Sequence, residues 1–232
     1  DRVLGRICNV IDYAAAKGWR TGDAAGWDKR LRHLLPSVPA KAKRIQHFAA
    51  MPYIDMPDFM KTIPDTMPGK ALKFLILTAS RSSEVRGAMA GEFDLDVGIW
   101  TVPPSRMKAG REHRVMLSKQ AVERVRPLLE GLTPEALVFP GEKQGALMHD
   151  MTLGRAMGDA GVTVHGFRST IRDWIGEETE FDTVAAEQCL AHSVGSAVER
   201  AYRRGAMDGK RRGIMQAWAN YCTAAEHARN VV

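Results

Sequence analysis

The sequence predicts a mainly α-helical protein of the α+β class, with one small antiparallel β-sheet. Apolar residues recur at helical spacing over most of the 232 residues, whereas the clearest β-type segments are confined to residues 98–117. The composition, with 45% hydrophobic and 26% charged residues, is that of a globular chain that can bury a core without disulfides.

The N-terminal part carries two helical patterns followed by a linker. Residues 3–17 have apolar residues at helical spacing, and Gly18 is suited to end that helix. A second short helix is expected over 24–34, and the prolines and cations of 36–48 indicate a linker. Because so few residues cannot form a domain, we interpret residues 1–40 as the last helices of a domain that begins earlier, plus a linker.

The remaining chain alternates helices with one hairpin. Helical spacing predicts helices at 56–63, 69–79, 119–131, 149–159, 166–177, 182–191, 196–203 and 208–228. The segments GIWTVP and HRVML are β-type and flank a polar turn that contains Gly110, which is typical of a hairpin. Ser118 is suited to cap the helix that follows this hairpin.

Cysteine usage and hydropathy exclude several classes of protein. The 3 cysteines lack CxxC spacing, which argues against a disulfide framework or a zinc site and fits a reducing cytosol. No signal peptide and no run of 18 apolar residues is visible, so we expect no membrane partner.

Positive charge is concentrated at the two ends of the chain. Residues 1–48 hold ten Lys or Arg against four Asp, and residues 192–232 hold seven against three acids. Residues 49–191 hold sixteen against twenty acids. Two basic ends fit a polyanionic partner such as nucleic acid, and the alternative is an inert basic surface.

The segment HGFRSTIRDW (165–174) is the first candidate for chemistry. Thr163 is suited to cap the helix that follows, and His165 and Arg168 then project from one face of its first turn. Free amides, an arginine and a histidine at such a place are suited to a phosphate oxygen. The alternative is chance, because this spacing occurs on many helices.

Two further segments carry cations. In LTASRSSEVRG (77–87), Arg81 directly follows an apolar helix, and Glu84 is placed to orient it through a bidentate pair. The alternative is a surface pair worth less than about 1 kcal/mol. In SRMKAGREH (105–113), Lys108 falls in the hairpin turn, where a lysine is either solvated or delivered into a groove as a proton donor.

The segment LAHSVGSAVERAYRRG (190–205) places Tyr202 ten residues after His192 and beside two arginines. Val198 and Ala201 suggest a packed side for its helix. Tyr202 is therefore either an aromatic residue at the edge of a core, with its hydroxyl in water, or a group whose hydroxyl attacks a substrate.

Taken in order, these segments resemble the motifs of the tyrosine recombinase (phage integrase) family, from about residue 45 to about residue 205. TASRSSEVRG resembles the family's first-arginine motif, and MKAGREHRVMLS its β-hairpin lysine motif. HGFRSTIRDW resembles its histidine–arginine motif, and LAHSVGSAVERAYRRG its closing histidine–tyrosine motif. The segments EFDLD, HGFR, RDW and AYRRG are most similar to integrases of prophages and genomic islands. Ala79 stands where many members have glycine, and Met89 where close relatives often have tryptophan.

The resemblance implies the tyrosine recombinase catalytic fold and six catalytic residues: Arg81, Lys108, His165, Arg168, His192 and Tyr202. The arginines would clamp a scissile phosphate of DNA, and the tyrosine would attack it to form a 3′-phosphotyrosyl bond. The lysine would protonate the leaving 5′-oxygen. The first histidine would act as an acid/base partner or hydrogen-bond donor, the second would hydrogen-bond the phosphate, and Glu84 would support the site. The covalent bond would store the energy of the cut, so religation would need no ATP. No cluster of acids at metal-ligand spacing accompanies these residues, so we predict no metal, and we expect no other cofactor.

The resemblance also implies a domain organisation and partners. Residues 1–40 would be the C-terminal remnant of a helical core-binding domain, and residues 41–232 the catalytic domain with its C-terminal helix. Double-stranded DNA attachment sites are the expected partner, bound by a homotetramer, with a host DNA-bending protein and an excisionase as accessory partners. The expected location is the cytoplasm of a bacterium, at its nucleoid. We expect DNA contacts from five basic residues: Lys41, Lys43, Arg44, Arg203 and Arg204.

Three alternatives stay open at this point. A type IB topoisomerase uses similar residues to relax DNA without exchanging strands. A non-catalytic DNA-binding relative would bind DNA with no chemistry, and a helical interaction protein would bind acidic partners through its positive ends. The docking site of the C-terminal helix is also open, because its apolar stripe either folds back on its own domain or docks on a neighbouring protomer. That stripe consists of Ile214, Met215, Trp218, Tyr221 and Cys222.

Overall fold

The computed structural model describes residues 2–21, 49–143, 145–192 and 207–227. The chain divides into two compact units, residues 1–47 and residues 48–232. In the first unit the described residues form helix α1 (Arg2–Ala16) and the turn after it.

Helix α1 ends as the sequence predicts. Gly18 has a φ of +71°, a left-handed conformation that glycine adopts without steric cost, and its N–H donates to Ala15 O at 3.0 Å. The predicted helix over 24–34, the linker over 36–48 and the helix over 196–203 lie outside the described residues.

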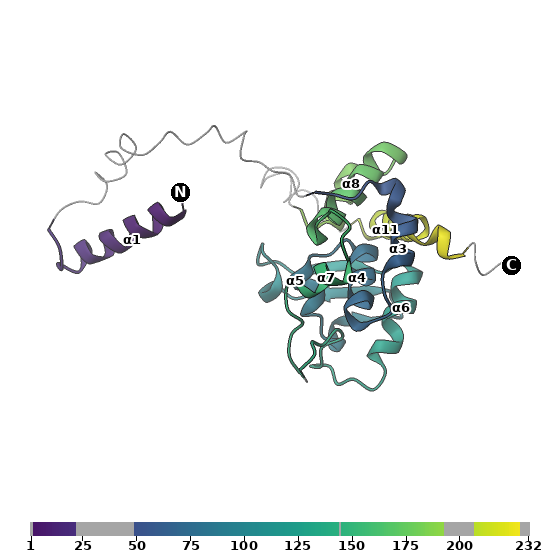
Figure 1. The fold of residues 1–232 in the computed structure, drawn as a ribbon, viewed down its shortest axis with the longest axis horizontal. Helices are drawn as coiled ribbons and strands as arrows, with labels where there is room; N and C mark the ends of the chain where they lie inside the picture. Colours follow the sequence, from purple (N-terminus) through teal and green to yellow (C-terminus); the bar gives the residue numbers. More distant parts are fainter. Residues whose placement is uncertain (1, 22–48, 144, 193–206, 228–232) are drawn as a thin grey trace. The chain divides into compact units, whose positions relative to one another are not determined.

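The second unit is mainly helical with a small antiparallel sheet, which confirms the predicted fold class (Figure 1). Its α-helices in the described residues are α3 (Met56–Thr62), α4 (Met67–Thr78), α5 (Ser82–Arg86), α6 (Lys119–Leu129), α7 (Thr152–Ala156), α8 (Phe167–Glu178), α9 (Thr183–Cys189) and α11 (Asp208–His227). Its strands are β1 (Phe93–Asp94), β2 (Ile99–Val102) and β3 (His113–Met116). Single 3-10 turns lie at η2 (Tyr53–Asp55), η3 (Ala90–Glu92), η4 (Pro104–Arg106) and η5 (Val164–Gly166). No helix in this described part is both long enough and apolar enough to cross a membrane.

Helix α4 forms the centre of the second unit. Its N-cap is Thr66, whose hydroxyl accepts from Gly69 N at 3.3 Å, and nearly all of its residues from Ala71 onward are buried. It contacts α5, α6, α7 and α11. Phe74 joins it to the sheet, because its ring centroid lies 5.5 Å from that of Trp100 on β2. The C-terminus of α4 is therefore a rigid platform.

The sheet confirms the predicted hairpin. Strands β2 and β3 pair antiparallel, with Val102 opposite His113, and Gly110 in the connection has a φ of +61°. Strand β1 pairs with β2 on its other edge. It was not predicted, because two residues are too few to show an alternating pattern.

Two helical segments differ from the prediction. The helix expected over 149–159 is only the five residues of α7, because the chain turns at Gly158, which has a φ of +68°. Helix α5 was not predicted, because its five residues are too short to display helical spacing.

Helix α11 folds back on its own unit in this structure. Ile214, Met215, Trp218 and Cys222 are buried, and the Trp218 indole N–H donates to Ile76 O of α4 at 2.9 Å. The helix contacts α3, α4, α6 and α9. The apolar stripe read from the sequence is thus covered by the core of the same chain.

Replacing Trp218 with alanine tests whether α11 is an integral part of the unit. The indole is fully buried and hydrogen-bonded, so we expect Trp218→Ala to lower the free energy of unfolding by about 3–5 kcal/mol, measured by urea denaturation followed by far-UV circular dichroism. Trp19, which is 73% exposed, supplies the control, and Trp19→Ala should change that free energy by about 0.5 kcal/mol or less. Equal effects of the two substitutions would contradict the packing of α11.

Candidate active site

Arg81 is held at the C-terminus of α4 by Glu84. Ala79 is the C-cap of α4 and has a φ of +51°, and Arg81 is the N-cap of α5. The side chain of Glu84 is 2% exposed, and its Oε1 accepts from Arg81 Nη1 at 2.6 Å. Its Oε2 accepts from the Arg81 backbone N–H at 2.9 Å. The expected bidentate pair is therefore divided between guanidinium and backbone, and the buried carboxylate excludes a simple surface pair.

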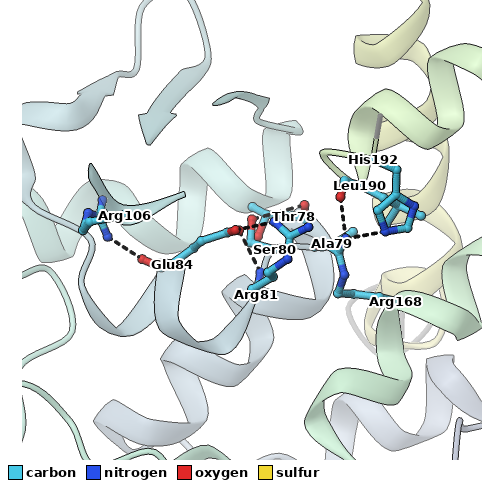
Figure 2. A network of polar contacts seen from close by, with 9 residues as sticks. All are labelled: Thr78, Ala79, Ser80, Arg81, Glu84, Arg106, Arg168, Leu190 and His192. Atoms are coloured by element: carbon cyan, nitrogen blue, oxygen red, sulfur yellow. Dashed lines mark hydrogen bonds and ion pairs between the residues drawn. The ribbon is translucent and has the colours of Figure 1, made fainter. Parts of the chain in front are cut away.

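Arg106 fixes the connection between α4 and α5 through a second set of contacts. It comes from the turn that follows β2, and its Nη1 donates to the backbone oxygen of Glu84 at 2.8 Å (Figure 2). Its Nη2 also pairs with Glu92, which accepts from the Trp100 indole at 2.9 Å. The loop that carries Arg81 is thus tied to both α4 and the sheet.

Arg168 joins the ends of two helices. It lies in the first turn of α8 and is 5% exposed. Its Nη1 donates to Ala79 O at the end of α4, and its Nη2 donates to Leu190 O at the end of α9 (Figure 2). Burial, and then the positive charge of Arg81, lower the pKa of Arg168 to about 10, so it stays charged at neutral pH. Within the described residues it has no ion pair with a carboxylate.

His192 is placed by the turn that ends α9. Ala191 adopts a φ of +51°, and its N–H donates to Gln188 O at 3.1 Å. The N–H of His192 donates to Glu187 O at 3.0 Å, which completes a Schellman motif. The ring then lies with Nε2 at 3.1 Å from Arg168 Nη2 and Nδ1 at 2.5 Å from Glu187 Oε2.

His165 and Lys108 complete the group from two other segments. Thr163 Oγ1 accepts from Gly166 N at 3.0 Å, which confirms the predicted cap, and η5 then continues into α8. Partial burial of His165 lowers its pKa, and electrostatic interactions with Arg168, Arg81, His192 and Lys108 lower it further. Lys108 lies exposed in the hairpin turn, as predicted, and its charge acts on His165.

The structure therefore brings together five of the six catalytic candidates. Arg168 and His192 are in direct contact, and Arg81 lies within electrostatic range of Arg168. His165 interacts electrostatically with these three residues and with Lys108. The predictions for Tyr202, Arg203, Arg204, Lys41, Lys43 and Arg44 fall on residues outside the described part of the chain.

His113 was missed by the sequence analysis. It begins β3 opposite Val102, and burial, then the charge of Arg211, lower its pKa to about 4. Arg81 and Arg168 lower it as well, so His113 belongs to the same positive region. The sequence did indicate that His113 faces the interior, because alternation along β3 puts it on the same face as Val115, which is buried.

Glu187 was missed for a different reason. It lies five residues before His192, a separation at which residues of a continuous helix do not face each other. The left-handed turn at Ala191 brings the two side chains together. Nothing in the residue types predicts that turn, because alanine is uncommon in that conformation.

The fold and this geometry define a mainly helical domain with a rigid, positively charged site suited to an anion such as a phosphate group. Residues 53–208 match the phage integrase family, and the chain belongs to that family.

The chain is similar to several curated integrases. It is 33% identical to prophage integrase IntA of Escherichia coli K12, over 97% of this chain and 54% of that protein. It is 32% identical to the integrase of enterobacteria phage P4, over 77% of this chain and 46% of that protein. The chain thus spans about half the length of these relatives.

Three solved structures share the fold. The integrase from mycobacterium phage Brujita matches with a TM-score of 0.56 and 18% identity, over 92% of this chain and 69% of that one. A lambda integrase dimer bound to a COC′ core site matches with a TM-score of 0.54 and 13% identity, over 88% and 72%. XerA recombinase matches with a TM-score of 0.50 and 16% identity, over 78% and 65%.

The lowered pKa of His113 predicts a pH-dependent stability. At a pH well above 6.5 this imidazole is neutral in both the folded and the unfolded chain. As the pH falls from there towards 4, the unfolded chain takes up a proton that the folded chain does not, so the free energy of unfolding falls. We expect a loss on the order of 1 kcal/mol per pH unit from this residue.

Urea denaturation at pH 7, 6 and 5 measures this loss. His113→Gln should lose less stability than the wild type over that interval, and His149→Gln, at an exposed position, controls for the removal of a histidine. Parallel pH profiles of wild type and His113→Gln would show that His113 is not kept neutral by its surroundings.

Proposed function

We propose that this chain is the DNA-cleaving and DNA-joining part of a site-specific recombinase that integrates or excises a mobile element. The observation that carries the proposal is the buried guanidinium of Arg168, bonded to two neutral carbonyls and to His192 beside Arg81, with no carboxylate of its own among the described residues. Such a site favours a bound anion, and the integrase relatives support a phosphate of DNA as that anion.

The arginines stabilise charge on the scissile phosphate. A phosphodiester resists attack because its oxygens are already negative, and negative charge grows in the transition state. Arg81 binds its non-bridging oxygens as a planar fork, and Arg168 donates to them from the N–H groups that Ala79 O, Leu190 O and His192 leave unused. Because Glu84, Arg106 and two helix ends fix both guanidiniums in advance, little reorganisation is needed when the phosphate enters.

Tyr202 is the nucleophile of the proposed reaction. Its phenolic oxygen forms a bond to phosphorus while the bond from phosphorus to the 5′-oxygen breaks. The phenolic proton goes to a base, and a proton goes to the leaving 5′-oxygen, which becomes a free hydroxyl. The 3′-phosphotyrosyl bond keeps the energy of the broken bond, so the reverse attack by a 5′-hydroxyl rejoins DNA without ATP or a metal.

The proton transfers fall to Lys108 and His165. An exposed lysine in a hairpin turn has the reach to donate a proton to the 5′-oxygen. The lowered pKa of His165 favours its neutral form at neutral pH, and that form accepts a proton from the phenol. His192, once protonated on Nε2, donates a hydrogen bond to a phosphate oxygen.

DNA binding extends beyond the reacting phosphate. We propose that Lys41, Lys43, Arg44, Arg203 and Arg204 contact the DNA backbone, which makes binding sensitive to salt. The lambda integrase dimer bound to a core site supports an analogous placement of the catalytic domain on double-stranded DNA. A homotetramer on paired sites, aided by a DNA-bending protein and an excisionase, is the assembly we propose for the full-length protein.

Recombination is favoured over topoisomerase activity by the relatives, which are named as integrases. Relaxation of supercoiled plasmid that lacks target sites would favour the topoisomerase alternative, and DNA binding with no adduct would favour a non-catalytic relative.

Substituting the nucleophile gives the most direct test. Tyr202→Phe should abolish the covalent adduct between the protein and nicked attachment-site DNA, measured by denaturing gel electrophoresis in a buffer with EDTA and no ATP. Tyr221→Phe, a tyrosine of α11 in the same unit, should form the adduct like the wild type. An adduct with Tyr202→Phe at wild-type level would refute the assignment.

The geometry of Arg168 gives a second test. A lysine cannot contact Ala79 O, Leu190 O and a phosphate as a fork, so we expect Arg168→Lys to lower the rate of cleavage on the order of 100-fold or more. Arg155→Lys, at an exposed position of α7, is the matched control and should cleave like the wild type. Single-turnover cleavage rates measure both, and equal rates would exclude Arg168 from the clamp.

A further inference from the structure

Glu187 and His192 form a pair that is bonded at both ends to helix α8. Glu187 Oε2 lies 2.5 Å from His192 Nδ1, and Glu187 Oε1 accepts from Arg172 Nε at 2.9 Å. His192 Nε2 lies 3.1 Å from Arg168 Nη2, a contact drawn in Figure 2. Arg168 and Arg172 are four residues apart on α8, so one face of this helix holds the pair from both sides.

These contacts favour one position for the proton of the neutral His192 ring. A guanidinium has only hydrogen-bond donors, so the nitrogen of His192 that faces Arg168 must accept. Nε2 therefore carries the lone pair, and the proton of the neutral ring lies on Nδ1, from which it is donated to the carboxylate of Glu187. Glu187 selects the tautomer that Arg168 requires.

The backbone adds a second constraint on the same residue. The peptide N–H of His192 donates to the carbonyl of Glu187, so Glu187 holds both the main chain and the ring of His192. The ring's position is then determined by the end of α9, and its orientation by a carboxylate that is 23% exposed.

We propose that Glu187 is a positioning residue: it fixes the proton of His192 on Nδ1 and directs Nε2 at the phosphate site beside Arg168. With Nδ1 committed to Glu187, Nε2 is the nitrogen that faces the phosphate site, where its lone pair can take up a proton that it then donates to a phosphate oxygen. The effect on DNA cleavage rests on the proposed function, whereas the effect on the tautomer does not.

A merely structural role would have a different signature. As a surface ion pair, with Arg172 67% exposed, Glu187 would contribute less than about 1 kcal/mol to stability and would leave the ring nitrogens of His192 as they are. The state of those nitrogens therefore separates the two roles.

Nitrogen NMR of the DNA-free chain labelled with ¹⁵N-histidine measures that state. His192 is assigned from the signals missing in His192→Gln. In the wild type at pH 7.5 we expect Nδ1 to be protonated and Nε2 to be unprotonated.

Glu187→Ala should move both resonances towards values averaged between the two tautomers. Glu187→Gln should restore the wild-type pattern, because an amide oxygen still accepts from Nδ1–H. Glu123→Ala, at an exposed carboxylate of α6, should match the wild type.

Cleavage of nicked DNA provides the functional readout. Glu187→Ala should lower the single-turnover cleavage rate by about 10- to 100-fold, with unchanged DNA affinity, and Glu187→Gln should recover most of that rate. Unchanged His192 resonances in Glu187→Ala, or cleavage by this variant at the wild-type rate, would overturn the inference. If the resonances behave as expected but the wild type itself forms no adduct, the proposed function fails and the tautomer assignment stands.

Discussion

The arrangement of the site depends on the hydrogen bonds from the Arg168 guanidinium to the carbonyl oxygens of Ala79 and Leu190. These oxygens lie at the C-termini of α4 and α9, where unsatisfied carbonyls and the helix dipoles concentrate negative charge. A cation at such a place is stabilised by both helices at once. Arg81 follows Ala79 by two residues, and His192 follows Leu190 by two. The Arg168 side chain therefore sets the distance between the segments that carry Arg81 and His192.

This arrangement also explains why the site is positively charged. The carboxylates nearest to it are already occupied: Glu84 holds Arg81, and Glu187 holds His192 and Arg172. They raise the pKa of Arg168 only through space, and burial still dominates and lowers it. The carboxylates thus orient the cations without neutralising the central one. Within the described residues the Arg168 guanidinium has no ion pair with an acidic side chain, and such a group favours a bound anion.

The sequence could predict what local pattern determines. The fold class, the β2–β3 hairpin and the cap at Thr163 follow from spacing and from residue type. The grouping of Arg81, Lys108 and Arg168 came from the resemblance to the recombinase motifs and stays a prediction as regards their catalytic roles. The sequence could not predict Glu187 as the partner of His192, because their approach depends on a left-handed alanine. Nor could it predict that Arg168 is anchored by carbonyls, since every residue supplies a carbonyl and only the tertiary fold decides which ones converge.

Both helix ends that bind Arg168 contain alanine in the left-handed conformation, at Ala79 and Ala191, each with a φ of +51°. That conformation costs an L-residue roughly 1–2 kcal/mol, a cost that glycine would avoid. Glycine, however, would give each turn access to many other conformations, and the carbonyls of Ala79 and Leu190 would be less firmly directed at Arg168. Alanine itself disfavours the left-handed shape, so both turns are held in it by the contacts around them, which include the bonds to the guanidinium. Strain of this kind persists where the surrounding contacts over-determine the backbone, and here those contacts are the ones that assemble the site.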